Sequence, residues 1–269
     1  MAVYGNIITN KLIAMDYVVQ EGNNICKIFE SMSVLNENGV LLEEDANKVA
    51  SKMIFNKIST FLKNLGNTIL NFFKNLKVKI RNLLGPSKNV TIDNLDVIDV
   101  KGYIEKYNEV NGKNSMQDVI DSCVKVGLMS AEWEFSKEQM GKLNEESAVS
   151  LEEMKKLLED IKNPEKVTIA NKQASVILNE LDAIDTRKTI TMLTSTAKKC
   201  EQMADYSSTD WAQFLTANGQ IFRNVSEYFT VSANVWKEIQ KHILTVYKDV
   251  VNYIKNNKNG GAKPAEESK

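Results

Sequence analysis

The residues that could carry chemistry are few. His242 is the only histidine of the chain, and it follows Glu238 by one turn of a predicted helix, with no serine or cysteine nucleophile tied to it by spacing. A histidine on the flank of a helix, beside a carboxylate four residues away, is the simpler interpretation. Histidine metal sites usually need two or three histidines. We therefore expect no catalytic residue, no metal site and no cofactor, and the sequence supports no class of enzyme.

Two groups of aspartates recur every three residues, as residues on one helix face do. The first group is Asp93, Asp96 and Asp99, and the second is Asp182 and Asp185. Neither group has the spacing or the bidentate glutamate of a calcium-binding loop. Both are more simply interpreted as solvated helix faces.

The other reactive groups and motifs give no stronger signal. Cys26, Cys123 and Cys200 lie far apart and form no C-x-x-C spacing, which favours free thiols in a reducing compartment. Phosphate-binding glycine loops and the G-x-S-x-G elbow of hydrolases are absent. Hydrolase, kinase and dehydrogenase functions therefore lack their usual motifs.

The most unusual segment is the stretch 51–84, whose apolar residues recur at the three-and-four spacing of an amphipathic helix. Its apolar stripe consists of Ile54, Ile58, Phe61, Leu62, Leu65, Ile69, Phe72, Phe73, Leu76 and Ile80, continued by Leu83 and Leu84. The opposite face is asparagine and lysine, and its cations are Lys52, Lys57, Lys63, Lys74, Lys77, Lys79 and Arg81. No acidic residue interrupts these cations.

The charge of the chain is close to zero overall but unevenly distributed. Residues 1–45 carry 2 basic and 7 acidic side chains, residues 46–92 carry 9 and 0, and residues 93–164 carry 9 and 16. A basic block therefore lies between two acidic ones, and the amphipathic stretch supplies most of it.

Three interpretations of this amphipathic stretch remain open. It is a core helix of the bundle, an interfacial helix that lies on an anionic bilayer, or a docking helix for an acidic groove of a partner. A dozen large apolar side chains favour any site that hides them from water, whether protein or lipid. The cations favour the bilayer, because each lysine near an anionic leaflet adds roughly 1 kcal/mol.

The elements around this stretch predict an all-α protein, an elongated bundle of long amphipathic helices. We expect five regions: an acidic helical segment at 1–44, the basic helix at 45–86, shorter acidic helices at 87–164, a long helical hairpin at 165–255 and a disordered tail at 256–269. The hairpin would join helices at about 167–205 and 211–254, with apolar stripes throughout.

Local signals divide the regions further. Gly22, followed by Asn23 and Asn24, predicts a kink or break in the first helix. Asp99 is the expected N-cap of a helix through Val110, although β-branched residues within 90–100 also admit a short strand. Ser136 and Ser150 each begin a capping box. The bond between Asn163 and Pro164 is the expected boundary before the hairpin.

The layout of an acidic leader, a basic helix rich in Phe, Ile, Leu, Lys and Asn, and a helical body resembles internal or ejected virion proteins of tailed bacteriophages over residues 41–86. The resemblance implies packaging in a virion and trimming by a prohead protease after L-x-E sites, which Leu42, Glu43 and Glu44 match.

No basic segment precedes the apolar N-terminus and no apolar run reaches a membrane span, so we expect synthesis in the cytoplasm without a secretory signal.

We therefore expect a non-enzymatic helical structural protein whose basic helix engages an anionic membrane surface or virion proteins. Nucleic acid is a weaker candidate, because contacts to phosphates alone would be salt-sensitive. The alternative is a soluble cytoplasmic scaffold in which residues 51–84 form an ordinary core helix. The sequence leaves the oligomeric state open.

Overall fold

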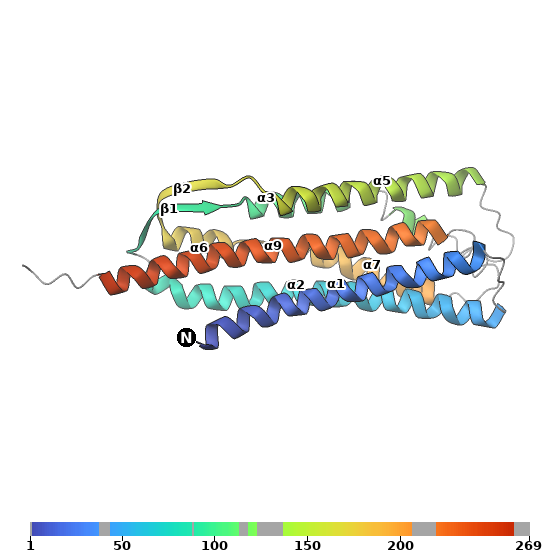
Figure 1. The fold of residues 1–269 in the computed structure, drawn as a ribbon, viewed down its shortest axis with the longest axis horizontal. Coiled ribbons are helices and arrows are strands. Elements are labelled where there is room, and N and C mark those ends of the chain that lie inside the picture. The colour runs from blue at the N-terminus through green and yellow to red at the C-terminus, as the bar shows by residue number, and fades with distance from the viewer. Residues whose placement is uncertain are drawn as a thin grey trace, which may run out of the picture.

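The computed structural model describes residues 2–37, 44–87, 89–112, 118–122, 137–205 and 219–260. Its elements in chain order are α1 (Ala2–Glu37), α2 (Glu44–Ser87), β1 (Thr91–Val97), α3 (Val100–Gly112), α5 (Lys137–Lys162), β2 (Val167–Gln173), α6 (Ala174–Asp182), α7 (Arg187–Ala204) and α9 (Gly219–Gly260). Residues 118–122 are also helical. Helices dominate the described residues and form an elongated bundle (Figure 1). The expected all-α class is confirmed.

Helix α9 runs through the middle of the bundle (Figure 1). Helices α1 and α5 pack along α9, whereas α2 packs mainly on α7 and α1. Because α2 and α9 have 44 and 42 residues, each spans roughly 65 Å at 1.5 Å per residue. These two long helices determine the elongated shape.

One hydrophobic core joins the helices. Phe73 of α2 and Tyr107 of α3 both make edge-to-face contacts with Trp236 of α9, at ring-centroid distances of 6.4 and 5.4 Å. All three side chains are buried. Edge-to-face pairs at such distances attract beyond the gain from burial alone. The core is therefore continuous from α2 through α9 to α3.

The described strands form one two-stranded antiparallel sheet, in a register that runs from Thr91 opposite Gln173 to Val97 opposite Val167. Ile92 of β1 is fully buried, whereas most of β2 is exposed. The chain leaves the bundle along β1 and returns along β2, after forming α3 and α5. We refer to β1, α3, α5 and β2 together as the arm.

The start of the arm contains both structures that the sequence admitted. The strand β1 confirms the short strand within 90–100, and α3 follows it directly. The carboxylate of Asp99 accepts a hydrogen bond from the backbone N–H of Gly102 at 2.9 Å, so the expected N-cap is confirmed. Asp93 and Asp96 therefore lie on a strand rather than on a helix face. Asp96 accepts a hydrogen bond from the hydroxyl of Thr168 at 2.7 Å across the sheet.

The expected helical hairpin at 165–255 is wrong in two respects. Residues 167–205 form β2, α6 and α7 instead of one helix, because the first seven of them pair with β1. Helix α7 packs mainly on α2, whereas α9 packs mainly on α1 and α5. Asp185 marks the break between α6 and α7, where its carboxylate accepts a hydrogen bond from the backbone N–H of Arg187 at 2.9 Å.

The expected break near Gly22 is also wrong, because α1 is continuous from Ala2 to Glu37. Gly22 instead marks a close approach of α1 to α9. A Cβ atom at this position would lie only 2.6 Å from Oγ1 of Thr230. Glycine at this position therefore allows α1 and α9 to pack closely, and it does not break the helix.

The remaining boundaries agree with the sequence in part. The end of α5 at Lys162 confirms the boundary before Pro164. Ser150 is buried inside α5 rather than at a helix start. Because α9 continues to Gly260, residues 256–260 are helical, and the expected disorder is wrong there. Three expected features lie outside the described part of the chain: Leu42 and Glu43 of the protease site, Ser136 of the first capping box, and the first residues, 211–218, of the last helix.

Candidate functional site

The apolar stripe of α2 lies in the core. All ten of its residues from Ile54 to Ile80 are at most 4 % exposed, and α2 packs them mainly against α7, α1 and α6. Their proposed role in binding a membrane or a virion partner therefore needs correction, because in this fold the protein itself covers them. Burial of the stripe agrees with the alternative interpretation of residues 51–84 as a core helix.

The polar side of α2 remains on the surface. We define the cationic face as seven of the basic residues of α2: Lys52, Lys57, Lys63, Lys74, Lys77, Lys79 and Arg81. Lys77 and Lys79 are half-buried, and the other five are exposed. The structure thus separates the expected interaction residues into a buried apolar set and an accessible cationic set.

Most of the cationic face is not neutralised by the bundle. Lys63 forms an ion pair with Glu201 of α7, and the hydrogen bond from Lys63 lowers the pKa of that carboxyl group. The other six cations make no ion pair among the described residues. Burial lowers the pKa of Lys79, because desolvation disfavours its charged form. The face therefore carries a row of largely uncompensated positive charge.

At the start of the neighbouring helix α7, Arg187 is neutralised locally by Asp185. The pKa of Asp185 is lowered to about 2, mainly by hydrogen bonds from Arg187, and Lys77 makes a smaller contribution. Arg187 therefore already forms an ion pair with Asp185, whereas Lys77 acts on Asp185 only as a nearby charge. This contrast leaves α2 as the helix with the longest run of unpaired cations among those described.

Three large apolar side chains in the described part of α2 are exposed, and two of them, Met53 and Val78, lie among the cations. Met53 is 54 % exposed and Val78 is 59 % exposed. Both fall outside the apolar stripe in the helical pattern, so the core does not cover them. Single exposed apolar residues are common, but here they lie among cations.

The residues that first suggested chemistry serve structural contacts. Nε2 of His242 lies 2.8 Å from the backbone carbonyl oxygen of Ile161 at the end of α5. Glu238 forms its ion pair with Lys241, so the expected pairing of His242 with Glu238 is not made. Within the described ranges, no group of three or more histidine, cysteine, aspartate or glutamate side chains could hold a metal ion. No described helix is long and apolar enough to cross a membrane.

Sequence reasoning missed a column of hydrogen-bonding side chains on α9. Asn224, Tyr228, Ser232, Trp236 and Gln240 recur every four residues, which places them along one oblique ridge of the helix. All five side chains are buried. Their four-residue spacing was the available signal, but it was hidden within the long apolar stripe of the same helix.

The column connects α9 to the arm. The hydroxyl groups of Tyr107 and Ser232 lie 2.6 Å apart, and the hydroxyl of Tyr228 donates to the side-chain oxygen of Asn111 at 2.7 Å. Further along, the amide of Asn224 donates to Oγ of Ser147 at 2.8 Å. Burial raises the pKa of Tyr107, which keeps its hydroxyl protonated. The arm is thus held to the bundle by specific polar contacts.

The last two members of the column differ from the others. Nε1 of Trp236 and both amide atoms of Gln240 are buried without a hydrogen-bond partner among the described residues. A buried polar group without a partner costs roughly 1–3 kcal/mol. The column therefore combines satisfied contacts at the arm with unsatisfied groups farther along α9.

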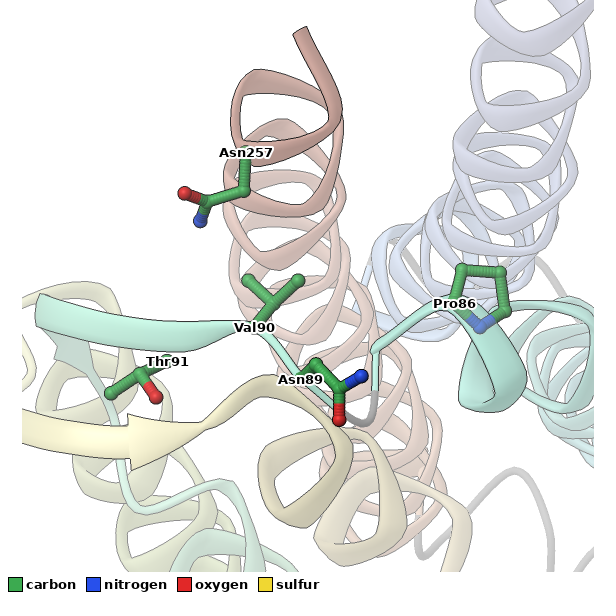
Figure 2. Close-up of a pocket in the computed structure, with 5 residues that line it drawn as sticks. All are labelled: Pro86, Asn89, Val90, Thr91 and Asn257. Atoms are coloured by element: carbon green, nitrogen blue, oxygen red, sulfur yellow. The ribbon is translucent and has the colours of Figure 1, made fainter. Parts of the chain in front are cut away.

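One surface recess lies where α2 ends, β1 begins and α9 approaches its C-terminal end. Its volume is about 500 Å³. It is lined by Pro86, Asn89, Val90, Thr91 and Asn257 (Figure 2). The described residues of the lining offer amide and hydroxyl groups but no carboxylate, histidine or thiol, so they supply no general acid or base to activate the hydroxyl of Thr91.

A second recess, of about 280 Å³, lies between α3 and α5. It is lined by Lys106, Glu109, Val110, Glu153, Lys156, Leu157 and Asp160. The mixed charges and the open position resemble an ordinary helix–helix groove. Neither recess joins the cationic face, which remains the surface feature with the clearest chemical character.

No protein-family model matches this chain, and neither a curated protein nor a solved structure is significantly similar to it. We therefore infer function from the fold and from the charges on its surface.

Proposed function

We propose that this protein is a non-enzymatic helical structural protein that docks to an anionic partner through the cationic face of α2. The observation that carries the proposal is that six of the seven cations have no ion pair among the described residues. The apolar stripe on the opposite face of α2 is buried in the core of the protein. The interaction is therefore an electrostatic one of an intact bundle, not insertion of an opened helix.

A row of like charges along one helix repels itself, and an anionic surface relieves that repulsion. Because exposed single ion pairs contribute at most about 1 kcal/mol, docking requires several cations to act together. The cationic face offers them along a straight helix, from Lys52 to Arg81. The resemblance of residues 41–86 to internal virion proteins of phages makes a virion the proposed setting.

The proposal is tested by titrating the intact protein with poly-L-glutamate, a simple acidic polypeptide, at low salt. We expect saturable binding that weakens as salt rises, because exposed charges are screened within about 10 Å at 0.1 M salt. The triple variant K52E/K74E/R81E should lose this binding. All three residues are exposed, so the variant should unfold at the temperature of the wild type.

A matched control carries the same change in net charge at another place. The variant K101E/K142E/K156E reverses three exposed lysines of the arm and should bind poly-L-glutamate nearly as well as the wild type. Equal losses in both triple variants would show that net charge, and not the cationic face, determines binding. Absence of binding by the wild type at low salt would refute the proposal.

An anionic bilayer is a second candidate partner, because Met53 and Val78 are more than half exposed among the cations. Apolar side chains beside lysines favour the headgroup region of a membrane. We expect the protein to sediment with vesicles that contain phosphatidylglycerol and not with vesicles of phosphatidylcholine alone. The vesicles should not leak, because the apolar stripe stays in the core. Loss of vesicle binding in the double variant M53S/V78S, with poly-L-glutamate binding retained, would favour the bilayer over an acidic protein.

A further inference from the structure

The charges of the described residues are divided between two sides of the bundle. Helix α2 carries eight basic and two acidic side chains. The described residues of 89–173, which contain the arm, carry nine basic and fifteen acidic side chains. In Figure 1, α5 and the sheet lie along one long edge of the molecule and α1 and α2 lie along the opposite edge, with α9 between them. Helix α2 and the arm therefore carry net charges of opposite sign.

The acidic residues of α5 form a regular row. Glu138, Glu145, Glu152 and Glu159 recur every seven residues, which is close to two turns of a helix, and all four are exposed. We call this row the acidic stripe. Glu138 and Glu145 make no ion pair among the described residues. Glu152 pairs with Lys155, and Glu159 pairs with Lys162, on the same helix. The stripe spans roughly 32 Å at 1.5 Å per residue.

The cationic face has a comparable row. Lys52, Lys63, Lys74 and Arg81 are separated by eleven, eleven and seven residues, and these intervals are close to three, three and two turns. The four side chains therefore share one line of α2, which spans roughly 44 Å. Two rows of opposite sign, roughly 32 and 44 Å long, thus lie on helices at opposite edges of one molecule.

We propose that the cationic face of one molecule docks against the acidic stripe of a second copy of this chain, in a head-to-tail contact. This inference rests on the proposed function, because it names the anionic partner of the same face. A single rigid bundle cannot bring its own two rows together, since α9 separates them (Figure 1). Each contact leaves one unused row at each end, so the assembly grows into an open oligomer unless its rotation closes a ring.

A second copy fits both rows better than a polyanion does. A nucleic acid or an anionic membrane would use only the cationic face, and the acidic side would add repulsion. A second copy uses both sides. Val149 lies between Glu145 and Glu152 and is 59 % exposed, as is Val78 between Lys74 and Arg81. Each row therefore has an apolar side chain within a charged rim, as interface cores often have.

Sedimentation velocity of the intact protein at low and high salt tests the inference. At about 0.01 M salt, where charges act over about 30 Å, we expect association that increases with protein concentration. At about 1 M salt, where the range is about 3 Å, we expect monomers. The variants K52E/K74E/R81E and E138K/E145K/E152K should each remain monomeric at low salt, because each has two rows of the same sign.

The decisive measurement is made on a mixture of the two variants. The reversed α2 of the first variant matches the reversed α5 of the second, and the unchanged rows match each other, so equal amounts should associate again. A chain that carries all six substitutions should self-associate as the wild type does. If either variant fails to fold, its glutamine counterpart, K52Q/K74Q/R81Q or E138Q/E145Q/E152Q, should still be monomeric.

Three results would overturn the inference: a wild type that is monomeric at low salt, reversal variants that still associate, or a mixture that stays monomeric. These results are separable from failure of the proposed function. The variant E138K/E145K/E152K keeps the cationic face and should still bind poly-L-glutamate. Binding of poly-L-glutamate without self-association would refute only the head-to-tail contact, whereas loss of both would refute the docking face itself.

Discussion

The two sides of Trp236 show that α9 is held by two kinds of contact. On one side its ring contacts Phe73 of α2, in a core of apolar side chains, and on the other it contacts Tyr107 of the arm. The hydroxyl of Tyr107 reaches Ser232, one turn earlier on α9. Apolar burial supplies most of the free energy of folding, whereas directed hydrogen bonds favour one register of the partners. Contacts with α2 therefore mainly stabilise the bundle, whereas hydrogen bonds position the arm on α9.

The largest expected effect is on the α2 side of this comparison. Replacement of Phe73 by alanine should lower the free energy of unfolding by about 3–5 kcal/mol, because it removes a buried ring and leaves a cavity beside Trp236. Chemical denaturation followed by circular dichroism measures this loss. The exposed Val78 on the same helix is the control, and V78A should change stability by less than about 0.5 kcal/mol. Similar values for both variants would contradict a core role for the stripe.

The next effect compares two glycines inside helices. A Cβ on Gly22 would meet Thr230 at 2.6 Å, whereas one on Gly66 would meet Leu193 at an ordinary 3.9 Å. We expect G22A to destabilise the protein by about 1–2 kcal/mol through overpacking. In contrast, G66A should stabilise it by about 0.5–1 kcal/mol, because alanine favours helix. Opposite shifts in thermal midpoint confirm the close contact of α1 with α9, and equal shifts contradict it.

A smaller effect is expected on the arm side of Trp236. Replacement of Tyr107 by phenylalanine keeps the ring contact but removes the hydroxyl next to Ser232, and should cost about 1 kcal/mol. In the double variant with S232A, the two losses should not add, because both remove the same hydrogen bond. A double-mutant cycle on the free energy of unfolding measures this coupling. Strict additivity would show that the two hydroxyl groups do not interact.

The smallest effect is a gain in stability. Both amide atoms of Gln240 are buried without a partner in the described part of the chain. Replacement by methionine, which has a similar shape, should be neutral or stabilise the protein by up to about 1 kcal/mol. The thermal midpoint of Q240M compared with Q240A separates loss of the amide from loss of packing. A midpoint of Q240M well below that of the wild type would mean that the amide has a partner.

The sequence predicted local features better than contacts. The bounds expected for the basic helix, 45–86, differ from those of α2 by one residue at each end, because its apolar spacing is a local property of the sequence. The N-cap at Asp99 was found for the same reason. By contrast, Val167–Gln173 was predicted as helix, because its pairing with β1 depends on residues far away in the chain. Of the candidate site, the one-signed row of cations opposite the apolar stripe follows from the sequence, but the burial of that stripe in the core did not.

The amino-acid sequence by itself determined that α2 and α9 are long amphipathic helices and that the cations of α2 share one face. These properties follow from the 100° turn per residue, which needs no partner. Only the tertiary structure decided what covers the apolar stripe, since protein and lipid offer similar gains from burial. It also decided that α7, rather than α9, packs mainly on α2, and that the acidic arm lies across α9 from the cationic face (Figure 1). Those outcomes depend on which faces meet, and many pairings of amphipathic helices satisfy the same local pattern.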